Sequence, residues 1–389
     1  MTIERTYFDW NATAPLRAEA RTAMMAALDH TGNASSVHGE GRAARKLIEA
    51  AREQVAALVG ASPKNVTFTS GGTEANMLAL TPAIEVGGLK APRDRLLISS
   101  IEHLSVRAGG RFALEQIQDV PVVSNGQIDL AALKDRLKGS ERTLVSVMLA
   151  NNETGVVQPI REVAEIVHEA GGLLHVDAVQ GAGRIPCDIA GLGADMMTIS
   201  AHKLGGPQGI GALIRRDEAL HIAQPLIKGG GQERGARAGT ENVAAIAGFG
   251  AAAAAAKLAM EQDARRMTAL RERLEAGLRA TAPSVVFFGH DSPRIPNTTL
   301  FAVASLKAET AIISFDLNGI AVSSGSACSS GKVAASHVLA AMGVAPELAR
   351  GAVRVSLGWS TTEDDIEQFL NAWNKVSSSL LKEQRGIAA

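Results

Sequence analysis

A glycine-rich turn follows the first apolar strand that the sequence predicts. Residues 66–69, Val-Thr-Phe-Thr, are typical of a strand and run directly into Ser70, Gly71, Gly72 and Thr73. Glycines followed by a hydroxyl residue at the start of a helix form a phosphate cradle, because free backbone N–H groups and the helix dipole both favour an anion. The same residues could cap an ordinary helix, so this turn alone leaves both interpretations open.

Two reactive side chains stand at the ends of later predicted strands. Asp177 follows the apolar residues 173–176, and Lys203 follows residues 196–200 and precedes a Gly-Gly-Pro turn. A lysine amine can form a Schiff base with an aldehyde, and a carboxylate can keep a pyridine nitrogen protonated so that the ring accepts electrons. With the phosphate cradle, these residue types indicate a site for pyridoxal 5'-phosphate (PLP). The alternatives are a helix cap for Asp177 and an ordinary surface position for Lys203.

Other cofactor motifs are incomplete. Residues 325–333, Gly-Ser-Ala-Cys-Ser-Ser-Gly-Lys-Val, resemble a phosphate-binding P-loop, but five residues separate the glycines where the motif has four. Val333 also replaces the Ser or Thr that would hold magnesium. The remaining glycine pairs lack the third glycine of a dinucleotide-binding fingerprint, and the sequence has no His-Glu-x-x-His zinc motif. The sequence therefore predicts neither a nucleotide site nor a metal site.

Composition narrows the class of protein. The 389 residues include 39 Lys and Arg against 40 Asp and Glu, and 3% aromatic residues. This balance argues against electrostatic capture of nucleic acid or an anionic membrane, and aromatic residues are too few for a base-stacking surface. We see no secretory signal and no uncharged apolar run of membrane-spanning length. Cys187 and Cys328 form no Cys-x-x-Cys pair, and such sparse cysteines are typical of a cytoplasmic protein.

Short apolar strands alternate with amphipathic helices over the first two thirds of the chain. This alternation predicts an α/β fold in which a mostly parallel sheet lies between helices, with ligands bound beyond the carboxyl ends of the strands. An Ala-rich helix is expected around residues 239–279, and a smaller α+β domain follows. The expected strands are residues 66–69, 96–99, 144–149, 173–176, 196–200 and 210–214, then 285–288, 298–303 and 353–357; the expected helices include residues 42–59, 160–169 and those from Glu363 onward.

Longer motifs recur in a fixed order from about Tyr7 to about Glu363. They include Phe8-Asp9-Trp10-Asn11-Ala12-Thr13, Thr69-Ser70-Gly71-Gly72-Thr73-Glu74-Ala75-Asn76, Glu102-His103, Asn151-Asn152-Glu153-Thr154-Gly155, His175-Val176-Asp177-Ala178-Val179-Gln180, Ser200-Ala201-His202-Lys203, Arg237-Ala238-Gly239-Thr240, Ser323-Ser324-Gly325-Ser326-Ala327-Cys328 and Arg354-Val355-Ser356-Leu357-Gly358. In this order the chain resembles the cysteine desulfurases, which belong to the class V branch of the fold type I PLP-dependent transferases. The Cys328 motif is similar to the group with the longer cysteine loop, which serves iron–sulfur assembly.

The resemblance implies a role for each matching residue around the cofactor. Lys203 would form the Schiff base with PLP, Asp177 would pair with the pyridine nitrogen, and Gln180 would hydrogen-bond the phenolic oxygen. His103 would stack on the ring and move protons. The phosphate group would be held by Gly72, Thr73, Ser200 and His202, and by Thr240 from the other subunit of a homodimer.

The substrate and the domains follow from the same resemblance. Asn152 and Arg354 would bind the carboxylate of L-cysteine, and a planar guanidinium can hold a carboxylate through two hydrogen bonds. We expect an N-terminal segment, residues 1–15, that packs with the small domain. The large PLP-binding domain would span residues 16–260 and the small C-terminal domain residues 261–389.

The two cysteines differ in their surroundings. Cys187 lies in Ile-Pro-Cys-Asp-Ile, which predicts a buried small hydrophobic residue. Cys328 lies among Ser and Gly residues, a composition that suits a moving loop. In the family that this chain resembles, a thiolate at this position attacks the sulfur of PLP-bound cysteine, so that Cys328 would carry a persulfide and alanine would leave.

The sequence thus predicts a PLP-dependent cysteine desulfurase that passes sulfur to an acceptor protein. An iron–sulfur scaffold, a tRNA-thiolation protein or a molybdenum-cofactor pathway would be compatible acceptors. Selenocysteine lysis or transamination on the same scaffold stays open, as does a non-catalytic sulfur-relay partner without PLP. Neither nucleic acid nor a membrane is expected as a partner.

Overall fold

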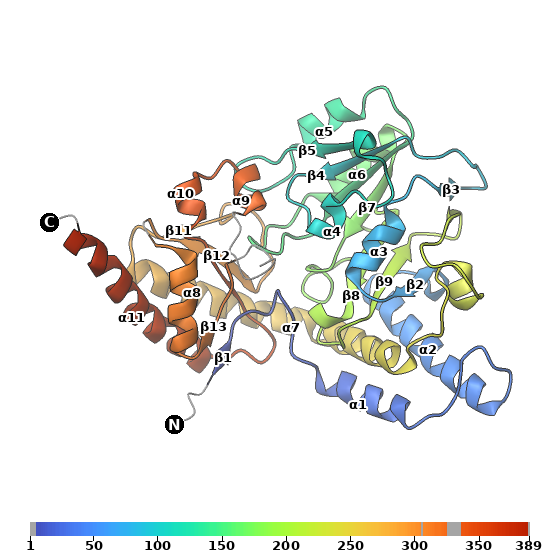
Figure 1. Cartoon of the computed structure of the whole chain (residues 1–389), viewed down its shortest axis with the longest axis horizontal. Helices are drawn as coiled ribbons and strands as arrows, with labels where there is room; N and C mark the ends of the chain where they lie inside the picture. The colour runs from blue at the N-terminus through green and yellow to red at the C-terminus, as the bar shows by residue number, and fades with distance from the viewer. Residues whose placement is uncertain (1–4, 305, 325–335, 388–389) are drawn as a thin grey trace.

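The computed structural model describes residues 5–304, 306–324 and 336–387, with backbone alone for residues 379–387 (Figure 1). A seven-stranded sheet with the order β2-β9-β8-β7-β6-β4-β5 forms the centre of the larger part. Strands β4 to β8 pair in parallel, whereas β9 runs antiparallel to both of its neighbours. The strands are β2 (Val66–Thr69), β4 (Arg95–Ser99), β5 (Ile117–Val120), β6 (Thr143–Met148), β7 (Leu173–Asp177), β8 (Met196–Ser200) and β9 (Gly211–Arg215). The predicted mostly parallel sheet is confirmed.

Helices cover both faces of this sheet, and successive strand residues contribute alternately to two apolar clusters. Leu97, Val145 and Val176 belong to the larger cluster, together with residues of the helices on that face. Leu96 and Leu144 belong to the cluster on the other face, under α3 (Gly72–Ala79) and α4 (Leu104–Arg107). The helices on the first face are α2 (Gly39–Leu58), α5 (Leu130–Leu137), α6 (Ile160–Glu169) and the first part of α7 (Val243–Thr281). Burial on both faces explains why these strands are continuous apolar runs.

The long helix α7 connects the two parts of the molecule. By length and composition alone it could cross a membrane. Its first half instead packs against α2 and α1 (Ala18–Leu28), and Ile246 and Phe249 there are almost completely buried in the larger cluster. Leu270 and Leu274 in its second half belong to the cluster of the smaller part. We therefore interpret α7 as a core helix.

The smaller part contains an antiparallel sheet with the order β11-β12-β14. Its strands are β11 (Val286–Phe287), β12 (Thr298–Ala302) and β14 (Val353–Ser356), and its helices are α8 (Ala308–Leu317), α9 (His337–Ala341), α10 (Pro346–Ala349) and α11 (Glu363–Ile387). Phe8 from the N-terminal segment is fully buried in this core, and β1 (Thr6–Tyr7) pairs with β13 (Ile320–Ala321). Strands β3 (Ile84–Val86) and β10 (Leu220–Ile222) form a separate two-stranded antiparallel sheet. The domain boundary predicted after residue 260 falls inside α7, and the three-part division stays a prediction.

Candidate active site

One cavity of about 530 Å³ lies where the strand ends of the large sheet meet the N-terminal segment and β14. It brings together residues that are more than 280 positions apart in the sequence, from Gly72 to Arg354. The predicted site residues that line it are Gly72, Thr73, His103, Asn152, Asp177, Gln180, Ser200, His202, Lys203 and Arg354. Thr240 is exposed and is not among the lining residues, and Cys328 lies outside the described residues.

Three residues that follow parallel strands form what we call the strand-end wall: His103 after β4, Asp177 at the end of β7 and Lys203 after β8. The carboxyl ends of neighbouring parallel strands meet at one edge of a sheet, so the fold delivers all three to the same place. Asp177 is buried, and its Oδ2 accepts a hydrogen bond from Asn76 Nδ2 at 2.8 Å. The wall thus combines a carboxylate, an imidazole and an amine.

The amine of Lys203 is held in an unusual electrostatic environment. Its Nζ donates hydrogen bonds to the carbonyl oxygens of Asn11 and Ala12, the latter at 2.7 Å. Burial, with smaller contributions from the nearby cations Arg354 and Arg184, lowers the pKa of Lys203 from 10.5 to about 7. A large fraction of the amine is therefore neutral near neutral pH, which is the form that attacks a carbonyl carbon.

The first turn of α3, where the sequence predicts a phosphate cradle, lines the cavity through Gly72 and Thr73. Strand β9 passes so close that a Cβ at Gly211 would lie 2.6 Å from the carbonyl carbon of Gly71. This close approach explains the glycine at position 211. Glu74 stabilises this turn through both carboxylate oxygens. Its Oε2 accepts a hydrogen bond from Ser70 N at 2.7 Å, and its Oε1 accepts one from Arg237 Nε at 3.1 Å. Gly72 and Thr73 are the first residues of α3, and the N–H groups of a first helical turn have no partner within the helix, so they can serve as donors to an anion.

His202 adds a neutral imidazole at this end of the cavity. Its Nδ1 lies 3.2 Å from Thr13 Oγ1. Burial, together with the nearby Lys203 and Arg184 charges, lowers the pKa of His202 to about 4. A neutral ring can donate one hydrogen bond to an anion without adding a buried charge.

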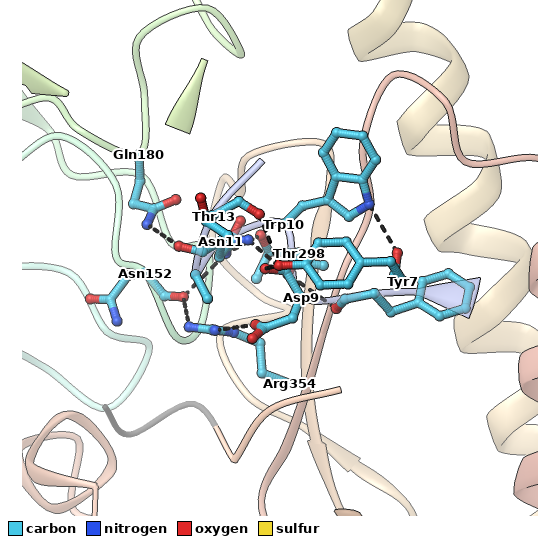
Figure 2. Close-up of polar contacts among 12 residues, drawn as sticks. Tyr7, Asp9, Trp10, Asn11, Thr13, Asn152, Gln180, Thr298 and Arg354 are labelled. Carbon is cyan, nitrogen blue, oxygen red and sulfur yellow. Dashed lines mark hydrogen bonds and ion pairs between the residues drawn. The ribbon is translucent and has the colours of Figure 1, made fainter. Parts of the chain in front are cut away.

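A second wall, which we call the N-terminal wall, consists of Asp9, Asn11 and Arg354 (Figure 2). Arg354 Nη2 pairs with Asp9 Oδ1 at 2.7 Å, and Arg354 Nη1 donates to the Asn152 carbonyl oxygen at 2.9 Å. Arg354 Nε has no hydrogen-bond partner in the described part of the chain. The guanidinium is thus fixed in orientation and keeps donor capacity for a further anion.

Asn11 connects this wall to both sheets. Its Nδ2 donates to the Asn152 carbonyl oxygen at 3.1 Å and to Thr298 Oγ1 at 2.8 Å, and its Oδ1 accepts from Asn297 Nδ2 at 3.1 Å. The side chain is 1% exposed. The backbone carbonyl oxygen of Asn11 also accepts a hydrogen bond from Lys203 Nζ, so Asn11 joins the N-terminal wall to the strand-end wall.

Gln180 is oriented by a buried arginine behind it. Gln180 Oε1 accepts from Arg184 Nη1, and Gln180 Nε2 donates to the Asn11 carbonyl oxygen at 3.1 Å. Arg184 is buried, and burial lowers its pKa to about 9. The guanidinium of Arg184 can only donate hydrogen bonds. It therefore fixes the Gln180 amide with its oxygen toward Arg184 and its N–H groups toward the Asn11 carbonyl oxygen.

Sequence reasoning assigned no role to several residues of this site. Asp9 and Asn11 lie within the motif of residues 8–13, but their partners Arg354 and Thr298 lie hundreds of positions away in the sequence. Asn76 stands three residues after Thr73 on α3, and this helical spacing places both on one face. Arg184 follows Gln180 by four residues. Helical spacing could have found Asn76, whereas nothing local identifies Asp9 and Asn11.

The structure confirms the prediction that Cys187 is buried, whereas the prediction for Cys328 stays untested. Cys187 is 3% exposed within the larger apolar cluster, as predicted. Burial raises the pKa of the Cys187 thiol to about 12, so it supplies no thiolate near neutral pH. Ser323 and Ser324 line the cavity directly before the segment that contains Cys328.

The residues present fit PLP. The cavity offers N–H groups at the start of α3 for a phosphate, a buried carboxylate at Asp177 for a ring nitrogen and a deprotonatable amine at Lys203 for an aldehyde. Its volume of about 530 Å³ is within the usual range for cofactor sites. His103 lines the same cavity and could contact the face of a planar ring.

Comparison with known proteins agrees with this geometry. Residues 6–369 match the family described as aminotransferase class-V. A cysteine desulfurase from Cereibacter sphaeroides is 42% identical over 384 residues, which cover 97% of each chain. The solved structure of a NifS-like protein from Rickettsia africae is 38% identical, with a TM-score of 0.87 over 96% of this chain and 100% of that chain. The structure described as SspA in complex with cysteine is 28% identical, with a TM-score of 0.75 over 90% of this chain and 98% of that chain. The chain therefore belongs to the aminotransferase class-V family and, within it, to the cysteine desulfurases.

Proposed function

We propose that this protein is a PLP-dependent cysteine desulfurase that converts L-cysteine to L-alanine and transfers the sulfur through a persulfide on Cys328. The observation that carries the proposal is the convergence of Lys203, Asp177 and His103 on one cavity beside the cradle of α3. When bound, PLP supplies an aldehyde that holds the amino group of the substrate and a ring that withdraws electrons from its α-carbon. The similarity to a structure described as containing cysteine supports the choice of substrate.

Lys203 is suited to attach the cofactor and then to move a proton. Its pKa of about 7 leaves the neutral amine available for the aldehyde. Held next to the Asn11 and Ala12 carbonyl oxygens, the amine could also take a proton from the substrate α-carbon. Asp177, buried at the end of β7, stabilises a positive charge on the ring nitrogen.

Arg354 and Asn152 orient the substrate. The guanidinium is already fixed by Asp9 and by the Asn152 carbonyl oxygen, so it loses little side-chain freedom when a carboxylate binds. Arg354 already forms an ion pair with Asp9. A substrate carboxylate would therefore bind to the N–H donors of Arg354 that Asp9 does not occupy. In this proposal the amino acid would bind with its α-carbon between the two walls.

The sulfur transfer step uses a thiolate. Cys187 is excluded by its burial and raised pKa, which leaves Cys328 as the nucleophile. The C–S bond of cysteine breaks, its sulfur joins the Cys328 sulfur as a persulfide, and the carbon takes a proton to give alanine. Thiolate plus cysteine thus yields persulfide plus alanine without an external oxidant or reductant.

The assembly and the recipient of the sulfur belong to the same proposal. We infer a homodimer in which Thr240 of each subunit approaches the cofactor phosphate of the other. Exposure of Thr240 and its absence from the lining of its own cavity support this arrangement. The sulfur acceptor would be a protein, such as an iron–sulfur scaffold, and the setting the cytoplasm.

The proposal is tested by mass spectrometry of the PLP-loaded protein after incubation with L-cysteine. We expect one additional sulfur atom on the peptide that contains Cys328 and an equivalent amount of alanine. Cys328→Ser should keep bound PLP and lose alanine formation, whereas Cys187→Ser, the matched control, should retain it. Alanine formation at the normal rate by Cys328→Ser would contradict the mechanism, and loss of the aldehyde form on adding an amino acid, reversed by pyruvate, would indicate a transaminase instead.

A further inference from the structure

A chain of hydrogen bonds connects Asp177 to His103 along the strand-end wall, through Asn76 and Ser105, which also line the cavity. Asn76 Nδ2 lies 2.8 Å from Asp177 Oδ2 and 2.9 Å from Ser105 Oγ. Ser105 Oγ lies 2.8 Å from His103 Nδ1, and the backbone N–H of Ser105 donates to the same Nδ1 at 3.2 Å. Asn76 and Ser105 are 1% and 8% exposed, so solvent does not compete for these bonds.

The chemistry of the donors gives this chain a direction. A carboxylate oxygen accepts and an amide nitrogen donates, so Asn76 directs one N–H to Asp177 and the other to Ser105. The opposite orientation of the amide would place its oxygen against the carboxylate of Asp177. Ser105 Oγ, which accepts from Asn76, has its own proton free to donate to His103 Nδ1.

His103 Nδ1 therefore faces two donors, the hydroxyl and the backbone N–H of Ser105. A ring nitrogen that accepts cannot carry a proton, and a neutral imidazole then has its proton on Nε2. His103 also caps the start of α4 through this contact, which fixes the position of the ring. Rotating the ring by half a turn would replace Nδ1 with a carbon and lose both bonds.

We propose that Asn76 and Ser105 are positioning residues that hold His103 as the Nε2–H tautomer and thereby make Nε2 the ring atom that exchanges protons in the cavity. This role deepens the proposed desulfurase function and rests on it for its catalytic meaning. The proton that His103 donates to, or recovers from, the reacting groups would leave and return at Nε2. Nδ1, held by Ser105, would take no part in the exchange.

The test is the tautomer itself, measured by nitrogen NMR on the full-length chain labelled with ¹⁵N-histidine, at pH 8 and without substrate. We expect a protonated Nε2 and an unprotonated Nδ1 for the signal that disappears in His103→Gln. A proton on Nδ1, or equal amounts of the two tautomers, in the unmodified protein would overturn the proposal.

Three variants separate positioning from general damage. Ser105→Ala removes one donor to Nδ1, and Asn76→Leu frees the Ser105 hydroxyl to accept from Nδ1. In each we expect the ratio of Nδ1–H to Nε2–H to rise about fivefold, the effect of one hydrogen bond of about 1 kcal/mol. Ser105→Thr keeps the hydroxyl and should hold the ratio within about twofold.

The outcomes can be assigned to one proposal or the other. If Ser105→Ala does not fold, the Asn76→Leu variant and the tautomer of the unmodified protein still test the positioning role. An unchanged ratio in folded Ser105→Ala and Asn76→Leu would refute the positioning role while leaving the desulfurase function untouched. Because no substrate is present, the expected tautomer would equally stand if alanine formation failed.

Discussion

The two walls of the cavity are built in different ways. In the strand-end wall, each chemical group stands within a few residues of the end of a buried parallel strand, at the edge where β4, β7 and β8 terminate together. In the N-terminal wall, Asp9 and Arg354 form an ion pair across 345 positions of sequence. The first wall depends on one sheet, whereas the second exists only when the N-terminal segment, the large sheet and β14 are packed together. The groups proposed for catalysis therefore lie at the end of one sheet, and the groups proposed to orient the substrate lie on a surface assembled from several segments.

Removing the amine of the strand-end wall should have the largest effect. Lys203→Ala is expected to abolish alanine formation from cysteine and to lose the yellow absorbance of attached PLP, because no other lysine lines the described part of the cavity. The matched control is Lys138→Ala, whose side chain is 75% exposed. Covalently attached PLP in Lys203→Ala would show that another amine serves the site.

The pH dependence of cofactor attachment measures how the two walls interact. Since the pKa of Lys203 is lowered to about 7, its amine is protonated below that pH and neutral above it. The rate of PLP attachment to the cofactor-free protein should therefore rise with pH and level off above about pH 7.

Arg354→Gln sharpens this measurement. Removing this cation from the N-terminal wall should move the midpoint to higher pH, because Arg354 contributes to lowering the pKa of Lys203. Arg350→Gln, in an exposed position near the same strand, is the control and should leave the midpoint unchanged. A midpoint near 10.5 in the unmodified protein would contradict the electrostatic account of the site.

The assembled wall should be sensitive to the loss of its central residue. Asn11→Ala removes the three side-chain hydrogen bonds to Asn152, Thr298 and Asn297 and leaves buried partners unpaired. We expect the free energy of unfolding in urea to fall by about 3 kcal/mol. The exposed Asn318→Ala should lower it by less than about 1 kcal/mol. Equal effects of the two substitutions would mean that Asn11 does not connect the two parts.

The smallest expected effect concerns a histidine within the sheet of the strand-end wall. His175 lies fully buried between Ser146 Oγ at 2.8 Å and Thr198 Oγ1 at 2.9 Å, and burial lowers its pKa from 6.5 to about 4. The unfolded chain thus takes up a proton below pH 6.5 that the folded protein excludes until about pH 4. This difference removes about 2 kcal/mol of stability between pH 7 and pH 5.

The comparison with His175→Gln isolates this effect. The variant keeps groups that can bond both hydroxyls but cannot take up a proton, so its free energy of unfolding should fall by about 2 kcal/mol less over the same interval. Denaturation at pH 7 and pH 5 measures this difference. An identical pH dependence in both proteins would show that His175 does not contribute to acid sensitivity.

Much of the large sheet is predictable from the sequence because its strands are buried on both faces. Residues 66–69 and 196–200 match β2 and β8 at both ends, and residues 160–169 match α6. Strand β5, Ile-Gln-Asp-Val, was missed because it lies at the edge of the sheet, where exposed polar residues interrupt the apolar pattern. The antiparallel direction of β9 also carries no local signal, since direction depends on how the chain returns to the sheet.

The sequence by itself determined the chemical groups of the strand-end wall. Apolar runs specify where strands end, and parallel strands bring their ends to one edge, so Asp177 and Lys203 could be placed near a phosphate cradle. Only the tertiary structure decided the rest. The pairing of Arg354 with Asp9 and the link from Asp177 through Asn76 to His103 arise from packing between segments that no periodicity relates. The physical reason is that local sequence governs backbone conformation, whereas the partner of a buried polar group and the pKa of a buried amine depend on which distant segments exclude water from it.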